Sequence, residues 1–563
     1  MRDLTRSQKA RLAIQSFKTI AHAVALRGYY RPSEKMGQSL ADCLVNLSPE
    51  IYGSMTDPRV MELKGLEYVV DRLPRGIEQC NRIILTEESQ FGAGRFEKLV
   101  PLRRRRTCYR ISEREICFAI TRGLSEIYDI LTHLTFLYIE AGKIHNRMKD
   151  ESGAYTAEWL DLERLVENGG TPDPDHLDQA IWNLSLILGR PYQETRAAHE
   201  SMDRNRREFN GNNGIFSIIY HLGKRYEGER ADQRRALVIY LTPSLMNIIG
   251  HQQYGEQWAM DIKDRLRELN LADRPLHIVS ANLHSVLNLV YGYAAFGSGM
   301  DGPPELYRFI ESIRDRTEEV AAFAKDRGFI PLPDRSGTQI DCQIIDTAAL
   351  GDLDFHPSLA VSPPGLDDDA PVILVMDYAF GMQAFEAMEN LLSPQSEDPV
   401  VPMKVRSISV MGKAGILPGK KGDVMLATAH IIEGSSDNYR LENDLEPEDF
   451  ESDASVFKGP MVTVPGTSLQ NQDLLRKFQE SWRTVGLEME GGHYQRAISA
   501  AIIKGHVPAD TRVRYAYYAS DNPLLSGETL AAGPMGTEGI RPTYMITKVI
   551  LEKILAGEKG SDS

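Results

Sequence analysis

Apolar residues recur every three or four positions through much of the first 235 residues, which is the spacing of an amphipathic helix. The pattern is clearest at residues 12–24, 63–85, 116–144 and 177–188. The tripeptide Ser48-Pro49-Glu50 has the composition of a helix start. We therefore predict a large, mostly α-helical domain over residues 1–235, whose sequence carries no catalytic motif.

The pattern changes near residue 236, where short apolar runs of strand type begin to alternate with helical patterns. Strands are predicted at residues 236–241 and 276–280, a helix at 306–327, and a loop rich in Pro and Asp at 353–371. Strands that alternate with helices are typical of an α/β layer. Residues 236–370 are therefore predicted to form an α/β region that belongs to the fold that follows.

The alternation becomes regular in residues 371–563, which we predict to be a further domain. Predicted strands and helices follow one another there: strands at 372–376, 407–411, 423–432, 461–464 and 512–519, helices at 384–392, 472–482, 490–503 and 543–555. The predicted fold class is thus α/β, preceded by the helical domain.

Composition narrows the function classes. At 563 residues, with 42% hydrophobic and 25% charged residues, the chain has the make-up of a soluble protein of two or three domains. A net charge of −15 argues against nucleic acid as a partner, because phosphate attraction needs a basic surface.

The five cysteines have no metal-ligand spacing, which predicts a reduced, cytoplasmic setting and no metal site. The polar N-terminus and the absence of an apolar run of about 18 residues predict neither secretion nor a membrane span.

Two motifs place carboxylates at the ends of predicted elements. V-G-L-E-M-E-G-G-H at residues 485–493 puts Glu490 at the start of a helix, and Y-A-S-D-N-P-L at residues 518–524 puts Asp521 at the end of a strand. Cleavage of an N-glycosidic bond needs an acid for the leaving base and a group that holds the ribose as positive charge develops on it. Asp521 suits the first role and Glu490 the second.

Four segments carry a resemblance to a known family. They are E-M-E-G at residues 488–491, S-D-N-P-L-L-S-G-E at 520–528, V-M-G-K-A-G-I-L with G-D-V-M-L-A within 410–427, and Phe380-Gly381-Met382 after a predicted strand. Together they resemble the nucleoside phosphorylase/nucleosidase superfamily, and most closely the catalytic domain of AMP nucleosidase. The resemblance covers residues 370–560, extends more weakly over 270–370, and does not reach the helical domain.

The resemblance implies a three-layer domain with a central twisted mixed sheet that hydrolyses a purine nucleotide or nucleoside without a cofactor. Asp521 would be the general acid toward N7 of the purine, and Glu490 would hold the ribose 2′ and 3′ hydroxyls. The remaining residues that it implies for substrate binding are Met489, Glu488, Ser520, Gly381, Gly412, Lys413, Ala414 and Gly415. Members of the family are oligomers, so the resemblance also implies a homo-oligomer.

Departures from the family pattern leave the substrate open. Ala379 stands where a glycine is usual, and Lys413 stands in place of a histidine. Pro418 and Ile432 fall at or near positions of arginines that engage phosphate. The resemblance therefore implies a nucleosidase, but the arginines that would bind the 5′-phosphate of AMP are absent from these positions. A phosphate-dependent purine nucleoside phosphorylase and a non-catalytic nucleotide sensor remain alternatives.

Three further features have two interpretations each. Arg103–Arg106 is either a solvated or acid-paired face, or an anion-binding surface. His284, in an Asn-x-His like one in the family, is either a site residue or a packing residue. His493 shares a helix face with Glu490 and is interpreted as a packing or hydrogen-bonding residue.

Overall fold

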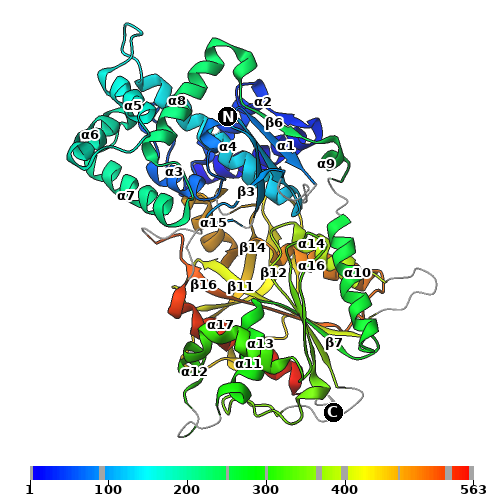
Figure 1. Ribbon diagram of the computed structural model, residues 1–563. Helices are drawn as coiled ribbons and strands as arrows, with labels where there is room; N and C mark the ends of the chain where they lie inside the picture. The colour runs from blue at the N-terminus through cyan, green and yellow to red at the C-terminus, as the bar shows by residue number, and fades with distance from the viewer. Residues whose placement is uncertain are drawn as a thin grey trace. The chain divides into compact units, whose positions relative to one another are not determined.

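The computed structural model describes residues 4–87, 95–104, 106–248, 253–297, 302, 304–362, 370–394, 403–466, 469–525 and 535–556. The chain folds into two compact units (Figure 1). The first is Met1–His251 with Ser468–Leu474, and the second is Gln252–Thr467 with Leu475–Ser563. The division falls at residue 251, whereas the sequence pattern placed it at 235.

Within the described residues of the first unit, six strands form one sheet in the order β1-β6-β2-β5-β4-β3. The strands are β1 (Tyr29–Tyr30), β2 (Arg82–Thr86), β3 (Glu97–Leu99), β4 (Thr107–Ser112), β5 (Glu115–Ala119) and β6 (Val238–Leu241). The helices are α1 (Arg6–Arg27), α2 (Lys35–Leu47), α3 (Leu63–Val70), α4 (Gly123–Arg147), α5 (Ala157–Glu167), α6 (Leu177–Leu188), α7 (Tyr192–Phe209), α8 (Ile215–Ala231) and α9 (Pro243–Ile248).

The helices predicted at residues 12–24 and 177–188 are confirmed as parts of α1 and α6. Those predicted at 63–85 and 116–144 are wrong in part, because β2 ends the first segment and β5 begins the second. The two strands pair in parallel, and β2 also pairs with β6. A short apolar run buried in a sheet centre has no period that distinguishes it from a buried helix.

In the basic tract Arg103–Arg106, Arg104 and Arg106 face acids inside the first unit, and Arg105 lies outside the described residues. Arg106 is 4% exposed and its guanidinium pairs with Asp129, while Arg104 Nε lies 3.4 Å from the same carboxylate. Burial would raise the pKa of Asp129, but Arg104, His133 and Arg106 hold it well below its usual value. The acid-paired interpretation is confirmed for these two arginines.

The second unit is built on one mixed sheet. Within the described residues, the strands of this sheet lie in the order β13-β12-β14-β15-β11-β7-β10-β9-β8, and β16 pairs with β11 and β12. The strands are β7 (Leu276–Ser280), β8 (Phe329–Leu332), β9 (Cys342–Asp346), β10 (Val372–Met376), β11 (Val405–Ile416), β12 (Val424–Ile432), β13 (Asn438–Arg440), β14 (Val456–Thr463), β15 (Gly486–Glu488) and β16 (Arg512–Asp521). The helices are α10 (Gln253–Glu268), α11 (Leu283–Phe296), α12 (Leu306–Ile313), α13 (Thr317–Ala324), α14 (Gln383–Leu392), α15 (Gln472–Trp482), α16 (Gly491–Ile503) and α17 (Ile540–Leu555).

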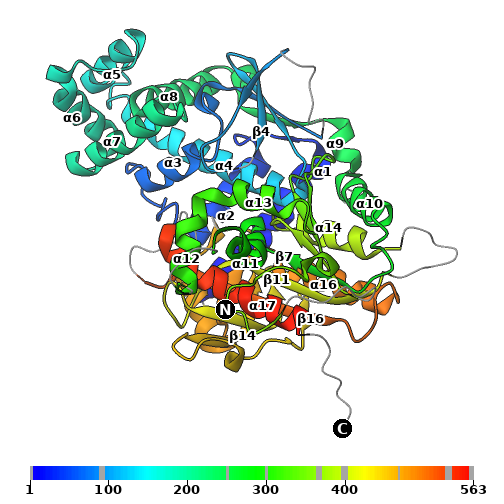
Figure 2. The ribbon, with the colours of Figure 1, turned by 60° about the horizontal axis from the view of Figure 1, so that its bottom comes forward.

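Helices cover both faces of this sheet (Figures 1 and 2). Apolar residues of α10, α14 and α16 pack in one core with one face of the strands, and those of α11, α12, α13 and α17 pack in another. All five residues of β10 are buried because Leu374 faces the first core while Ile373 and Val375 face the second. The predicted α/β fold with a three-layer C-terminal domain and a central mixed sheet is confirmed.

Candidate active site

Several candidate residues lie at one edge of the second sheet. Strands β7, β10, β11 and β16 are joined by parallel pairings, so their carboxyl ends point the same way. In open α/β sheets, ligands bind outside the carboxyl ends of the strands. The turn after β10 contains Gly381, and the last residue of β16 is Asp521.

Gly381 and Glu490 are brought into contact although 109 positions separate them. The Gly381 N–H donates to Glu490 Oε1 over 2.9 Å. Gly381 has φ of 56°, a left-handed conformation that glycine adopts without strain, and it precedes α14. Glu490 is the residue immediately before α16. The backbone of the Phe380–Met382 segment therefore orients the Glu490 carboxylate of the E-M-E-G segment.

The motif around Glu488 fixes the start of α16. Glu488 is 5% exposed, and its Oε2 accepts the N–H of Glu490 at 2.6 Å and also that of Gly491. Its Oε1 accepts the Thr463 hydroxyl and lies 3.4 Å from His430 Nδ1. Burial alone would raise the pKa of Glu488, but His430, Thr463 and the Gly491 N–H lower it below its usual value. The Glu488 carboxylate thus binds groups inside the protein.

Asp521 is 2% exposed at the end of β16. The Ser520 hydroxyl lies 2.5 Å from Asp521 Oδ1 and 3.3 Å from the Ala414 carbonyl oxygen. The next residue, Asn522, donates to the carbonyl oxygens of Leu417 at 3.1 Å and Gly419 at 2.7 Å. These contacts hold the strand end against the neighbouring chain segment.

Gly415 connects the two carboxylate motifs. It pairs with Asp521 of β16 on one side and with Leu487, next to Glu488, on the other. Residues 412–415 are therefore part of strand β11 rather than a loop after it, and the register with β16 shifts between Ala414 and Gly415. Such a bulge redirects the strand at that point.

The remaining predicted site residues differ in exposure. Ala414 is buried, Met489 is half-buried and Lys413 is exposed. A Cβ placed on Gly412 would lie 3.5 Å from the ring of Tyr378, in the turn after β10. Tyr378 is 37% exposed, and no sequence motif pointed to it.

The two histidines have different surroundings. The ring of His284 lies 6.2 Å from that of Tyr544, and burial followed by Arg314 lowers the pKa of His284. The neighbouring Asn282 caps α11 by accepting the Ser285 N–H at 2.9 Å, which gives this Asn-x-His a structural explanation. His493 is 9% exposed in the first turn of α16.

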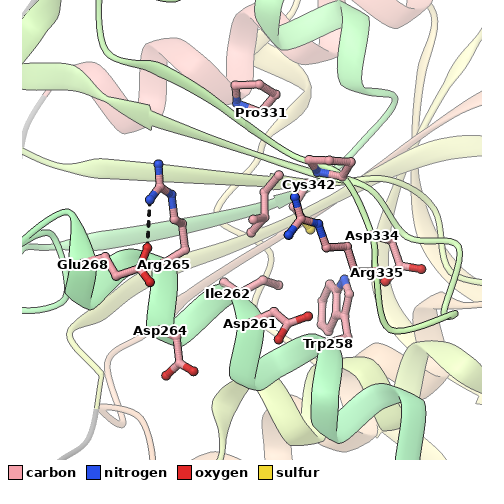
Figure 3. Close-up of a pocket in the computed structure, with 12 residues that line it drawn as sticks. Trp258, Asp261, Ile262, Asp264, Arg265, Glu268, Pro331, Asp334, Arg335 and Cys342 are labelled. Carbon is pink, nitrogen blue, oxygen red and sulfur yellow. Dashed lines mark hydrogen bonds and ion pairs between the residues drawn. The ribbon is translucent and has the colours of Figure 1, made fainter.

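A cavity of about 440 Å³ lies elsewhere, between α10 and the sheet edge at β8 and β9 (Figure 3). Its charged side chains are largely occupied: Arg265 pairs with Glu268 at 2.8 Å, and Asp334 accepts backbone N–H groups of its own loop. None of the predicted site residues lines it.

Within the part of the chain that the structure describes, no cluster of His, Cys, Asp and Glu is arranged to hold a metal. In the same residues, no helix is long and apolar enough to cross a membrane.

Comparison with family models gives one assignment. Residues 38–299 and 304–556 match a family of unknown function, DUF6909. The chain belongs to this family. No curated protein matches it.

Solved structures similar to this DUF6909 member have the nucleoside phosphorylase/nucleosidase fold. A putative methylthioadenosine nucleosidase from Weissella paramesenteroides is 12% identical, covers 50% of this chain and 99% of its own, and has a TM-score of 0.30. A futalosine hydrolase mutant from Helicobacter pylori is 11% identical, with coverages of 50% and 98% and a TM-score of 0.29. Purine nucleoside phosphorylase from Toxoplasma gondii with immucillin-H is 16% identical, with coverages of 51% and 91% and a TM-score of 0.28.

Proposed function

We propose that this protein hydrolyses the N-glycosidic bond of a purine nucleoside or nucleotide. The observation that supports this most directly is the contact of Gly381 with Glu490, because it joins two of the segments that resemble the nucleosidase family. The position of Gly415 between Leu487 and Asp521 adds the other two segments. The residues chosen for their chemistry thus gather around the carboxyl ends of parallel strands.

In the proposed reaction, Glu490 accepts hydrogen bonds from the ribose 2′ and 3′ hydroxyls. The carboxyl group of Asp521 gives its proton to N7 of the purine, and the electrons of the C1′–N9 bond leave with the base. Water then adds to C1′, and the proton that it loses returns to the Asp521 carboxylate. A fixed carboxylate beside the sugar also stabilises the positive charge that develops on the ribose.

Glu488 is proposed to act as a positioning residue. It holds the N–H groups of Glu490 and Gly491, which fixes the start of α16 and with it the direction of the Glu490 side chain. Thr463 adds to this arrangement, since its oxygen also accepts the Gly492 N–H at 2.9 Å.

Replacing Glu488 with glutamine is expected to lower the free energy of unfolding by about 1–3 kcal/mol, because charge-assisted bonds to buried N–H groups are lost. The pKa of Glu488 is lowered from 4.5 in the folded protein, so its contribution is present at neutral pH and is lost as pH falls below that value. The variant should therefore lose less stability than wild type on acidification. Urea unfolding at several pH values measures this difference in stability.

The matched control is Glu446→Gln, an exposed glutamate paired with Lys458, for which a change within about 0.5 kcal/mol is expected. Equal acid sensitivity of wild type and Glu488→Gln would contradict the prediction.

Replacing Gly412 with alanine is expected to weaken substrate binding while the protein stays as stable as wild type. The added methyl would make only ordinary contact, 3.5 Å from Tyr378, so folding is not disturbed. If the ribose or base lies against this glycine, the methyl takes its place and KM rises by about tenfold or more. Steady-state kinetics and thermal unfolding test both parts. Gly228→Ala, whose nearest neighbour would be Arg235 at 3.8 Å, is the control. An unchanged KM would remove Gly412 from the proposed site.

A panel of substrates tests whether a 5′-phosphate is needed. Pro418 and Ile432 offer no charge, and the ammonium group of Lys421 pairs with Glu538. The protein should therefore be incubated with a panel of purine nucleosides and nucleotides, with and without inorganic phosphate, and the free base measured by chromatography. Base release without phosphate is the expected result. A strict requirement for phosphate would indicate a phosphorylase, and no release from any compound would indicate a nucleotide sensor.

A further inference from the structure

A second cavity, of about 350 Å³, lies in the second unit at the amino ends of β7, β10, β11 and β16. These strands run parallel to one another. The cavity at their amino ends therefore lies opposite the candidate active site, which is at their carboxyl ends. Along β16, the nine steps from Arg512 to Asp521 correspond to about 30 Å. The cavity is thus a separate place on the same strands.

Cations dominate its lining. The cavity contains Arg406, Arg512, Arg514 and Lys553, with Asp510 as the carboxylate among the described lining residues. The whole chain carries a net charge of −15, so a concentration of positive charge in one cavity runs against its average. Such a site attracts an anion.

Two of these cations are fixed by acids beside the cavity. Arg514 is 1% exposed, and its Nε donates to Asp444 Oδ2 at 2.8 Å while its Nη1 donates to the Ser407 hydroxyl at 2.8 Å. Lys553 Nζ lies 2.8 Å from Asp449 Oδ1. These contacts balance the charges of both side chains, and buried Arg514 and Ser407 form the floor of the cavity.

The other two arginines, Arg406 and Arg512, are exposed. Arg512 faces Ser407 across the β11–β16 pairing, and Arg406 lies at the irregularity of the β11–β7 pairing between Val405 and Ser407. Within the described ranges neither forms an ion pair, so both guanidinium groups can donate to a ligand. The planar guanidinium group binds two oxygens of a phosphate at once.

His277 is a further polar residue in the lining of this cavity. Its Nδ1 lies 2.7 Å from the Ser407 oxygen. Burial, followed by Arg514, Arg406 and Arg512, lowers the pKa of His277 to about 3, so its ring is neutral at pH 7. Since Arg514 can only donate to Ser407, the serine proton is available to the ring.

We propose that this cavity binds a phosphate-type anion through Arg406 and Arg512, above the floor formed by Arg514 and Ser407. Among the described lining residues there is no Trp, Tyr or Phe on which a purine could stack, and the ring of His277 is held against Ser407. The ligand is therefore a compact phosphate or the phosphate group of a small ester, rather than a nucleoside. This proposal is independent of the proposed catalytic function.

The test is isothermal titration calorimetry of the full chain with inorganic phosphate and, separately, glycerol 3-phosphate, at constant ionic strength. The variant is the double substitution Arg406→Gln with Arg512→Gln, which alters exposed side chains and leaves the buried Arg514 in place. The control is Arg308→Gln, an exposed arginine of α12 outside the cavity. We expect wild type and control to bind at least one probe, and the double variant to bind it about tenfold more weakly or worse. Tighter binding of the ester than of phosphate would identify a phosphorylated metabolite as the ligand, and the reverse would identify free phosphate.

Absence of binding of either probe to wild type at tens of millimolar, or equal affinity in the double variant, would overturn the proposal. Base release measured on the same samples separates this result from the catalytic one, because the double variant leaves the active-site residues intact. Binding that is lost in Asp521→Asn but kept in the double variant would place the phosphate in the candidate active site and so contradict the proposal.

Discussion

Replacing Asp521 with asparagine is expected to lower the rate of base release by a factor of about 10²–10⁴, the usual contribution of a positioned general acid. Asparagine has nearly the same shape and its carbonyl oxygen can still accept from Ser520, which lies 2.5 Å away in wild type. It cannot give a proton to N7. The loss should therefore appear in kcat, while a purine ligand still binds with similar affinity.

The control for this variant is Asp437→Asn, an exposed aspartate of the same unit. It should release base at the wild-type rate. Thermal unfolding of both variants separates lost chemistry from lost folding. A rate for Asp521→Asn within a few fold of wild type would remove Asp521 from the reaction, whereas lost activity together with lost ligand binding would point to a structural role.

Replacing Glu490 with glutamine is expected to reduce kcat/KM for a ribonucleoside by about 10–100-fold. The carboxylate accepts from two ribose hydroxyls in the proposed complex, and loss of the charge-assisted part of these contacts, about 1.5–3 kcal/mol in total, corresponds to that factor. The glutamine oxygen can still accept the Gly381 N–H, so the local backbone is kept.

The substrate itself supplies the matched control for Glu490. A 2′,3′-dideoxynucleoside lacks both hydroxyls, so the substitution should change its kcat/KM much less than that of the ribonucleoside. The difference between the two substrates is the interaction free energy of a double-mutant cycle. An equal loss for both substrates would show that Glu490 acts on something other than these hydroxyls.

The fold of the second unit was largely predictable because its buried strands are short apolar runs between helical patterns. Residues 372–376 and 472–482 match β10 and α15, and the predicted strand at 423–432 begins one residue before β12. Strand β8 was missed because it carries Pro331 at the sheet edge, and β15 because three residues are too few for a pattern. The helix predicted at residues 306–327 is divided into α12 and α13 by a 3-10 helix at Arg314–Arg316.

The candidate site was predictable as a set of residues and not as an arrangement. Local sequence marks Glu490 as the start of a helix and Asp521 as the end of a strand, and both positions are correct. The contact of Glu490 with Gly381 depends on how strands far apart in sequence pair, which no local pattern contains. The same holds for Gly415, which was predicted to lie beyond a strand and lies inside β11. Part of the segment at residues 520–528 lies outside the described residues.

The central claim is that water takes the place of the purine at C1′. It is tested by incubating the protein with its best purine substrate in phosphate-free buffer made with ¹⁸O-labelled water, and measuring free base and sugar by mass spectrometry. The account predicts equal amounts of base and of sugar carrying one ¹⁸O atom at C1′ when it is analysed before exchange. An intact substrate, or base release only when phosphate is added, with the sugar recovered as its 1-phosphate, would contradict it.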